Sequence, residues 1–365
     1  MSESSMRLSD DHVAPALPTT YVSIQQLRAL AALGVVLAHL EIYLGRMGFT
    51  GAWPHFLTSG VDIFFVISGF IMWVTTADRT VTPGQFLLNR LIRIAPLYWV
   101  VTSLALAVLL TNKGLMPGAA LDWGHVFASF LFIPAVHPVL GEPQPLVTAG
   151  WTLNFEMMFY TLFALALFLP QRFRINAVLT LLLGVVSLRA FDPRPFGAIW
   201  FYSSNIILEF GFGVMIGALV TAGRRYSTRT GAILVVLGAI LVVLLSEVRE
   251  AEHLRAILRG VPSAMIVLGA VMLELDGRVL VSRFARFLGD ASYSIYLTHG
   301  MVLSAFTRVW MKLLPPALSN SFPLFCFAGF VVAAVAGSAI YLWVEKPLGR
   351  IAKNLLSPRR KSVAA

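Results

Sequence analysis

Two ionisable residues, Arg28 and His39, lie in one apolar segment that runs from Tyr21 to Tyr43. They are eleven positions apart, which is three helical turns plus about 20°, so they share one helix face. Their separation along the helix axis is roughly 16 Å, about half the thickness of a bilayer core. Ionisable groups in a membrane helix are costly and indicate function. A base and a cation at two depths of one helix therefore indicate chemistry across a membrane, although a lone His also occurs as a structural hydrogen-bonding residue.

Two carboxylates are predicted to reach the depth of His39. Asp62 stands at the outer end of the next apolar segment, where it either orients the imidazole or caps its own helix. Glu156 lies about one turn into a later segment, on a face that it shares with Thr152 and Tyr160. A carboxylate in apolar surroundings needs a partner or becomes protonated. We therefore expect Glu156 or Asp62 to fix the tautomer of His39.

Arg90 and Arg93 are three residues apart at a helix start, so they share one face. Guanidinium groups suit phosphate, but arginines at a membrane face also serve as simple topology anchors. Spacing alone favours the anchors. Glu345, near the end of the last apolar segment, is expected to be structural and paired with an Arg.

Polar residues on two further helices are predicted to face the inside of a helix bundle and to line a substrate path. For His299, a satisfied core histidine is an equal alternative. The predicted path residues are Trp151, Thr152, Tyr160, Tyr296 and His299.

The elements that position these residues are membrane-spanning helices. Hydrophobic residues make up 58% of the 365 residues and charged residues only 13%, far below the roughly 25% of soluble domains. Apolar stretches long enough to span a bilayer recur along the chain, which predicts an all-α polytopic membrane protein of about ten transmembrane helices. The predicted spans are roughly 22–44, 59–77, 94–112, 150–169, 175–190, 200–222, 230–246, 257–274, 289–312 and 321–344.

Lys and Arg set the predicted orientation. They are more frequent in the connections on the side of the N-terminus, which places both termini in the cytoplasm. Residues 1–20 are expected to be a disordered cytoplasmic tail, 21–346 the membrane domain, and 347–365 a basic cytoplasmic tail. The net charge of +10 is explained by these loops, so nucleic acid is not an expected partner. A single cysteine, Cys326, excludes an intrachain disulfide.

The longest outer connection, 113–149, holds five prolines with aromatic residues between them. A long loop beside a membrane core is often a lid or an acceptor platform. An interfacial loop with aromatic anchors is an equal alternative.

The ordered set of segments resembles the acyltransferase-3 family of membrane-bound bacterial O-acyltransferases. The segments 23–32 and 70–76 are most similar to its exopolysaccharide acetyltransferase branch. The matching pieces are Arg28 with His39 eleven residues later, Val61–Phe70, Arg90-Leu-Ile-Arg93, Trp151–Glu156, Tyr293–His299 and Glu345-Lys-Pro347.

This resemblance implies ten transmembrane helices in the bacterial cytoplasmic (inner) membrane. It implies an acyl-CoA donor on the cytoplasmic side, with acetyl-CoA favoured, and a glycan hydroxyl as acceptor, free or lipid-linked. Functional importance carries over to Arg28, His39, Arg90 and Arg93. Membrane lipids and a polysaccharide biosynthesis assembly are further expected partners, and no metal is expected.

Acyl transfer from a thioester to a hydroxyl needs a base, stabilisation of the oxyanion and a site for the CoA phosphates. His39 is the expected general base, with a covalent acyl-His intermediate as a less favoured variant. Arg90 and Arg93 are expected to bind the phosphates, and Arg28 to contact the pantetheine or the thioester carbonyl. The alternative function is a transporter or flippase for a glycan or small anion, against which stands the lack of internal repeats.

Overall fold

The computed structural model describes residues 20–77, 79–116, 118–191, 197–223, 227–248 and 252–356. This part of the chain is helical and contains no strand. Its α-helices are α1 (Val22–Arg46), α2 (Gly60–Thr76), α3 (Pro83–Thr111), α4 (Trp123–Phe130), α5 (Trp151–Ala166), α6 (Gln171–Ser187), α7 (Ala198–Tyr202), α8 (Leu208–Thr221), α9 (Thr228–Leu245), α10 (Val261–Leu275), α11 (Arg283–Leu313), α12 (Pro316–Ser319), α13 (Phe322–Ile340) and α14 (Lys346–Leu356).

Shorter helical turns join these helices. The 3₁₀ turns are η1 (His55–Ser59), η2 (Lys113–Leu115), η3 (Thr148–Gly150), η4 (Leu188–Ala190), η5 (Asn205–Ile207) and η6 (Glu252–Leu254). Two turns are π-helical: η7 (Ala256–Gly260) leads directly into α10, and η8 (Tyr341–Glu345) joins α13 to α14. Such π-turns often occur at functional sites.

Each of the ten predicted spans coincides with helical structure. Within the described residues, seven helical segments are long and apolar enough to cross a membrane, and 205–221 is a shorter apolar helix. The helix α5 is not among the seven, since it has only 16 residues. The protein is therefore a multi-pass membrane protein, and its count of ten spans and its orientation stay predictions. The predicted disordered tail lies, but for Thr20, outside the described residues, as does the basic tail from 357 onward.

Helix starts follow from local sequence. The side chain of Thr82 accepts a hydrogen bond from the backbone N–H of Gln85, and Pro83 occupies the first turn of α3. Ser282 caps α11 in the same way through Ala285 N–H. These caps satisfy backbone donors that a helix start leaves without a partner.

Small residues allow the central helices to approach closely. A Cβ atom on Gly69 of α2 would collide with the carbonyl oxygen of Phe210 in α8, and one on Gly213 would collide with that of Val66. These two helices therefore touch backbone to backbone, as small residues permit in membrane proteins.

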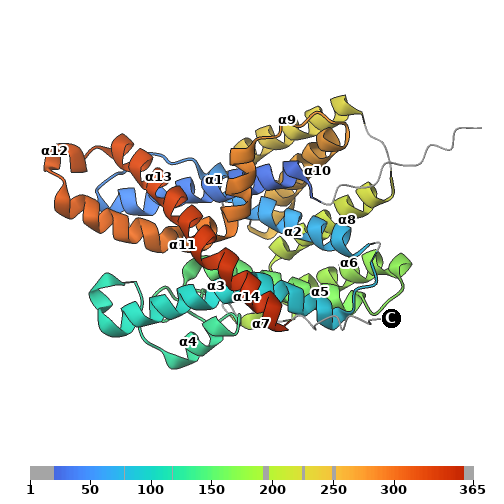
Figure 1. Cartoon of the computed structure of the whole chain (residues 1–365), viewed down its shortest axis with the longest axis horizontal. Helices are drawn as coiled ribbons and strands as arrows, with labels where there is room; N and C mark the ends of the chain where they lie inside the picture. The colour runs from blue at the N-terminus through green and yellow to red at the C-terminus, as the bar shows by residue number, and fades with distance from the viewer. Residues whose placement is uncertain are drawn as a thin grey trace, which may run out of the picture.

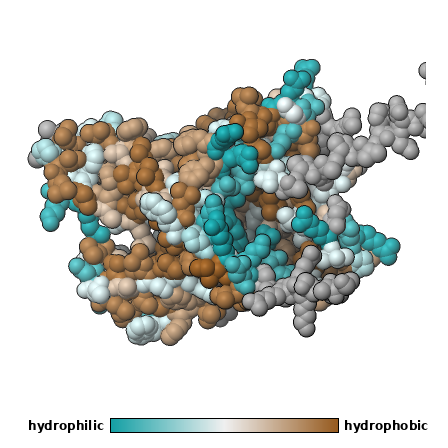
Figure 2. All heavy atoms as spheres, viewed as in Figure 1, coloured by the Kyte–Doolittle hydropathy of each residue, from teal (hydrophilic) through white to brown (hydrophobic). Residues whose placement is uncertain are grey.

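The bundle has α1 near its middle, in contact with α2, α10, α11 and α13 (Figure 1). The short helix α12 lies at the left end of the view, and α4 lies at its lower edge. Figure 2 shows apolar residues over much of the outer surface, with a hydrophilic band crossing this face over α14. An apolar exterior is what lipid contact requires.

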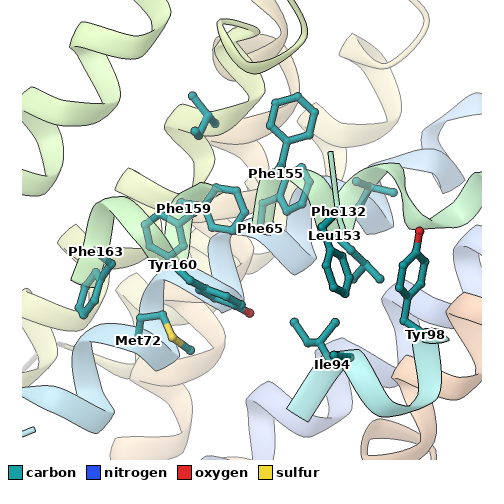
Figure 3. Packing of buried hydrophobic residues seen from close by; sticks show 14 of the residues in the cluster. Phe65, Met72, Ile94, Tyr98, Phe132, Leu153, Phe155, Phe159, Tyr160 and Phe163 are labelled. Carbon is teal, nitrogen blue, oxygen red and sulfur yellow. The ribbon is translucent and has the colours of Figure 1, made fainter. Parts of the chain in front are cut away.

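Aromatic side chains fill the core between α2, α5 and α8. Phe159 stacks on Phe210 with ring centroids 4.3 Å apart, and Phe155 stacks on Phe201 at the same distance. Figure 3 shows Phe155, Phe159 and Phe163 along α5 on the side facing this core, with Phe65 beside them. This packing fixes α5, which carries Glu156.

Candidate active site: two cavities that share one tyrosine

Two cavities lie inside the bundle. The outer cavity has a volume of about 1220 Å³ and is bordered by His39, Trp151 and His299. The inner cavity has a volume of about 390 Å³. Tyr296 and Val61 border both cavities. The predicted site residues that line the inner cavity are Arg28, Arg90, Arg93, Thr152, Glu156, Tyr160 and Tyr296.

His39 presents one nitrogen to the outer cavity. Its Nδ1 lies 2.8 Å from the carbonyl oxygen of Val35, one turn earlier in α1. A carbonyl oxygen only accepts, so Nδ1 carries the proton and Nε2 keeps its lone pair. The helix itself thereby sets the tautomer that a general base needs.

His299 lies directly against this base. The two rings are 4.7 Å apart and inclined by 66°. The Nδ1 of His299 lies 2.5 Å from the carbonyl oxygen of Tyr296, which fixes the same tautomer as in His39. His299 is only 2% exposed, whereas His39 is half-buried. His39 is therefore the histidine that a ligand in the cavity reaches more readily.

The inner cavity carries three cations and a carboxylate. Glu156 accepts a hydrogen bond of 3.0 Å from the Tyr160 hydroxyl and lies within electrostatic range of Arg28, Arg90 and Arg93. The cavity therefore holds a net positive charge around one acid. Such a site suits a polyanion.

Arg93 is held by a buried partner. One of its guanidinium nitrogens lies 2.5 Å from Glu345, which also accepts a 2.6 Å hydrogen bond from Ser294. Glu345 is 5% exposed, while 43% of the Arg93 side chain remains accessible. The expected ion pair between Glu345 and an Arg is confirmed.

The prediction that a carboxylate orients His39 is wrong. Among the described residues, no hydrogen bond joins His39 to Asp62 or Glu156. Glu156 lies in the inner cavity, and a backbone carbonyl occupies the position predicted for a carboxylate. Asp62 is fully buried and lies 3.1 Å from the Arg255 side chain.

Sequence reasoning missed two residues of the Asp62 cluster. Arg255 immediately precedes the π-turn η7, and the fully buried Glu209 of α8 lies within electrostatic range of Asp62 and Arg255. The available signal was an acid inside the apolar segment 205–221, which is as costly as any other intramembrane charge.

Tyr296 separates the two cavities. Its hydroxyl donates to the Ala149 carbonyl at 3.1 Å and accepts from the Thr152 hydroxyl at 3.1 Å. Its ring also contacts Phe64 edge to face, with centroids 5.9 Å apart.

The long loop has one feature that suits each of its two expected roles, and both roles stay predictions. Trp123 and Phe127 are more than half exposed, as anchors at a membrane surface would be. His137, in contrast, borders the outer cavity and accepts hydrogen bonds at Nδ1 from Val139 and Leu140 N–H. Burial, and the charge of neighbouring His125, lower the pKa of His137 below its usual value.

The comparison with known proteins decides the family. The acyltransferase domain profile of the acyltransferase-3 family matches residues 21–343. The chain belongs to this family. It is therefore a membrane-bound acyltransferase, and the transporter alternative is set aside.

Three relatives of this acyltransferase are named for exopolysaccharide production or for O-acetyl transfer to peptidoglycan. It is 37% identical over 297 residues to the exopolysaccharide production protein ExoZ of Rhizobium meliloti (strain 1021), which covers 80% of this chain and 89% of that protein. It is 25% identical to the putative peptidoglycan O-acetyltransferase YrhL of Bacillus subtilis, over 88% of this chain and 54% of the relative. It is 24% identical to the peptidoglycan O-acetyltransferase OatA of Listeria monocytogenes, over 89% of this chain and 55% of that relative.

The acyltransferase thus spans about half the length of these two peptidoglycan O-acetyltransferases. No solved structure matches it. Among the described residues, no group of three or more His, Cys, Asp and Glu side chains could hold a metal ion.

Proposed function

We propose that the protein transfers an acyl group, with acetyl favoured, from acyl-CoA in the cytoplasm to a hydroxyl of an exopolysaccharide or of its lipid-linked precursor. The observation that carries this proposal is the pair of cavities that share Tyr296, one lined by arginines and the other by His39. The 37% identity with an exopolysaccharide production protein supports the choice of acceptor class. Relatives named O-acetyltransferases support the choice of acetyl.

The inner cavity would receive the donor. CoA carries phosphates on a long, flexible arm that ends in the thioester. Arg28 and Arg90, with Arg93 held by Glu345, would bind the phosphates through charge-assisted hydrogen bonds. The thioester end would then reach toward Tyr296, the boundary with the outer cavity.

The outer cavity would receive the acceptor. The Nε2 lone pair of His39 would take the proton of a sugar hydroxyl while its oxygen attacks the thioester carbonyl. The carbon–sulfur bond breaks, and the leaving thiolate takes the proton from the imidazolium. The products are the glycan ester and free CoA thiol, so that no external reagent is needed.

The same proposal places the protein in a bacterial cytoplasmic (inner) membrane with both termini inside. A polyanionic donor made in the cytoplasm requires the arginine-lined cavity to open there. A polysaccharide biosynthesis assembly in this membrane would supply the acceptor.

The test measures the acetate content of surface polysaccharide from cells that lack the protein. These are compared with cells that re-express wild type, His39→Ala or His253→Ala. His253 is the control because its side chain is exposed in η6. The proposal is supported if the deletion loses acetate, if wild type and His253→Ala restore it, and if His39→Ala does not. Acetate that stays unchanged in the deletion would overturn the choice of acetyl or of acceptor.

A second assay uses the purified protein in lipid nanodiscs with acetyl-CoA. Release of free CoA should depend on an added glycan and on His39. Release that ignores the glycan would contradict direct transfer to a sugar hydroxyl.

A further inference from the structure

The charged side chains that line the outer cavity are all arginines. Four arginines and four histidines border it, and none of its described lining residues is Asp or Glu. A cavity whose walls carry one sign of charge concentrates ligands of the opposite sign. The arginines are Arg46, Arg255, Arg259 and Arg308.

Two of these arginines serve the packing of the bundle. Arg255 lies 3.1 Å from the fully buried Asp62. Arg259 donates to the carbonyl oxygen of Ser246 at 3.1 Å and to the Thr58 hydroxyl. Their positions are explained by these contacts, and the inference does not depend on them.

The other two arginines converge on one tyrosine. The Arg46 guanidinium lies over the ring of Tyr43, 5.2 Å from its centroid, and the charges of Arg46 and Arg308 both act on the Tyr43 hydroxyl. Neither arginine forms an ion pair with a described residue. Arg308 uses one N–H to donate to the Leu115 carbonyl at 2.5 Å, which leaves most of its five donors for a ligand.

Arg46 stands in register with the base. It follows His39 by seven residues, which is about 20° short of two turns, so both side chains lie on one face of α1. Their separation along the axis is roughly 10 Å. This distance leaves room for a sugar ring between a hydroxyl at His39 and a charged group at Arg46.

We infer that Arg46 and Arg308 form a binding site for a negatively charged group of the acceptor, so that the acceptor is an acidic glycan rather than a neutral one. The inference rests on the proposed function. The charged group is a carboxylate on a sugar or the phosphate of a lipid-linked sugar. Arginines that only anchored the protein in a membrane would turn toward headgroups, whereas these two border the cavity.

The experiment measures equilibrium binding to the purified full chain in nanodiscs of neutral lipid. The carboxylate probe is a galacturonate oligosaccharide, and its neutral counterpart is a galactose oligosaccharide of equal length. The phosphate probe is a polyprenyl diphosphate sugar, and its neutral counterpart is the polyprenyl glycoside. One acidic probe should bind roughly tenfold more tightly than its counterpart, and added salt should reduce this preference.

Variants locate the site. Arg46→Gln and the double variant Arg46→Gln/Arg308→Gln should lose the preference, and Arg46→Lys should retain part of it. Lys312→Gln is the matched control, since Lys312 is an exposed cation at the end of the same helix α11 and does not border the cavity. Arg46→Gln alone keeps the test sound if loss of the Arg308–Leu115 contact disturbs folding.

Equal binding of acidic and neutral probes by the wild type would overturn the inference. So would a preference that survives in the double variant. Because the readout is binding, a protein that prefers an acidic probe but transfers no acyl group would refute the proposed function and leave this site standing. A protein that transfers acetyl to neutral and acidic glycans equally well would refute this site and leave the proposed function standing.

Discussion

The two cavities hold their functional groups in different ways. In the inner cavity, side chains from different helices hold one another, as in the contacts of Arg93 with Glu345 and of Glu345 with Ser294. In the outer cavity, His39 and His299 are each held by a carbonyl oxygen of their own helix. Cation geometry in the inner cavity therefore depends on the arrangement of the bundle. The proton positions of the two bases depend only on local helix geometry.

The largest effect should come from the outer cavity. His39→Ala removes the Nε2 lone pair and should lower the rate of acyl transfer by about 10²- to 10⁴-fold, the usual contribution of a general base. Affinity for acetyl-CoA should stay near the wild-type value, because the donor is assigned to the other cavity. A time course of acyl transfer measures the rate, and a binding titration on the same preparation measures the affinity for acetyl-CoA. Normal transfer by His39→Ala at equal protein level would remove it as the base.

The next effect tests the donor side. Arg90→Ala with Arg93→Ala should weaken acetyl-CoA binding by at least about 10- to 100-fold, since the loss of a single hydrogen bond to a charged group costs about 1.5–3 kcal/mol. A binding titration measures the change. Unaltered affinity would make both arginines topology anchors.

The cross-helix contact can be tested separately from the donor. Arg93→Ala alone leaves the buried Glu345 without its cation and should lower the free energy of unfolding by roughly 1–3 kcal/mol. Adding Glu345→Gln should recover part of this loss, because residue 345 then carries no buried charge. Thermal unfolding in detergent follows both variants. If Glu345→Gln brought no recovery, the loss would not come from the ion pair.

A smaller effect concerns the boundary between the cavities. Tyr296→Phe keeps the ring and removes the hydroxyl that contacts Ala149 and Thr152. Loss of about 1 kcal/mol of hydrogen bonding should change the transfer rate by roughly fivefold. Binding of the donor and acceptor measured singly should change little. A rate equal to wild type would show that the hydroxyl plays no part in passage between the cavities.

The smallest effect is on the loop beside the outer cavity. The folded protein lowers the pKa of His137, so the unfolded chain binds more protons as pH falls through about 6.5. The loop's stability should therefore be complete above this pH and decrease below it. Hydrogen exchange at residues 131–147, corrected for intrinsic rates, should become faster as the pH falls from 7 to 5.5. His137→Asn should reduce this pH dependence.

Sequence spacing predicted which residues face the interior. Except for Asp62, every predicted site residue borders one of the two cavities. The reason is that helix periodicity gives the shared face of Arg28 and His39, or of Thr152, Glu156 and Tyr160, without knowledge of neighbouring helices.

Sequence spacing could not predict which helices these faces meet. Glu156 and His39 were assigned the same depth, but depth along a helix says nothing of position around the bundle. Spacing allows Asp62 either to orient His39 or to cap its own helix, because it does not reveal Arg255, 193 residues later, as the partner of Asp62. Contacts between distant segments depend on helix packing, which close approaches such as that of Gly69 and Gly213 determine.

The single helix α1 carries Arg28, His39 and Arg46 on one face. Inserting one residue between any two of them would turn the later ones by about 100° and shift them by about 1.5 Å. The intervening apolar residues can be exchanged for others of similar size, but their number cannot change. The number of residues in this helix sets the distances between the three side chains. The protein should therefore tolerate substitution in this segment far better than insertion or deletion.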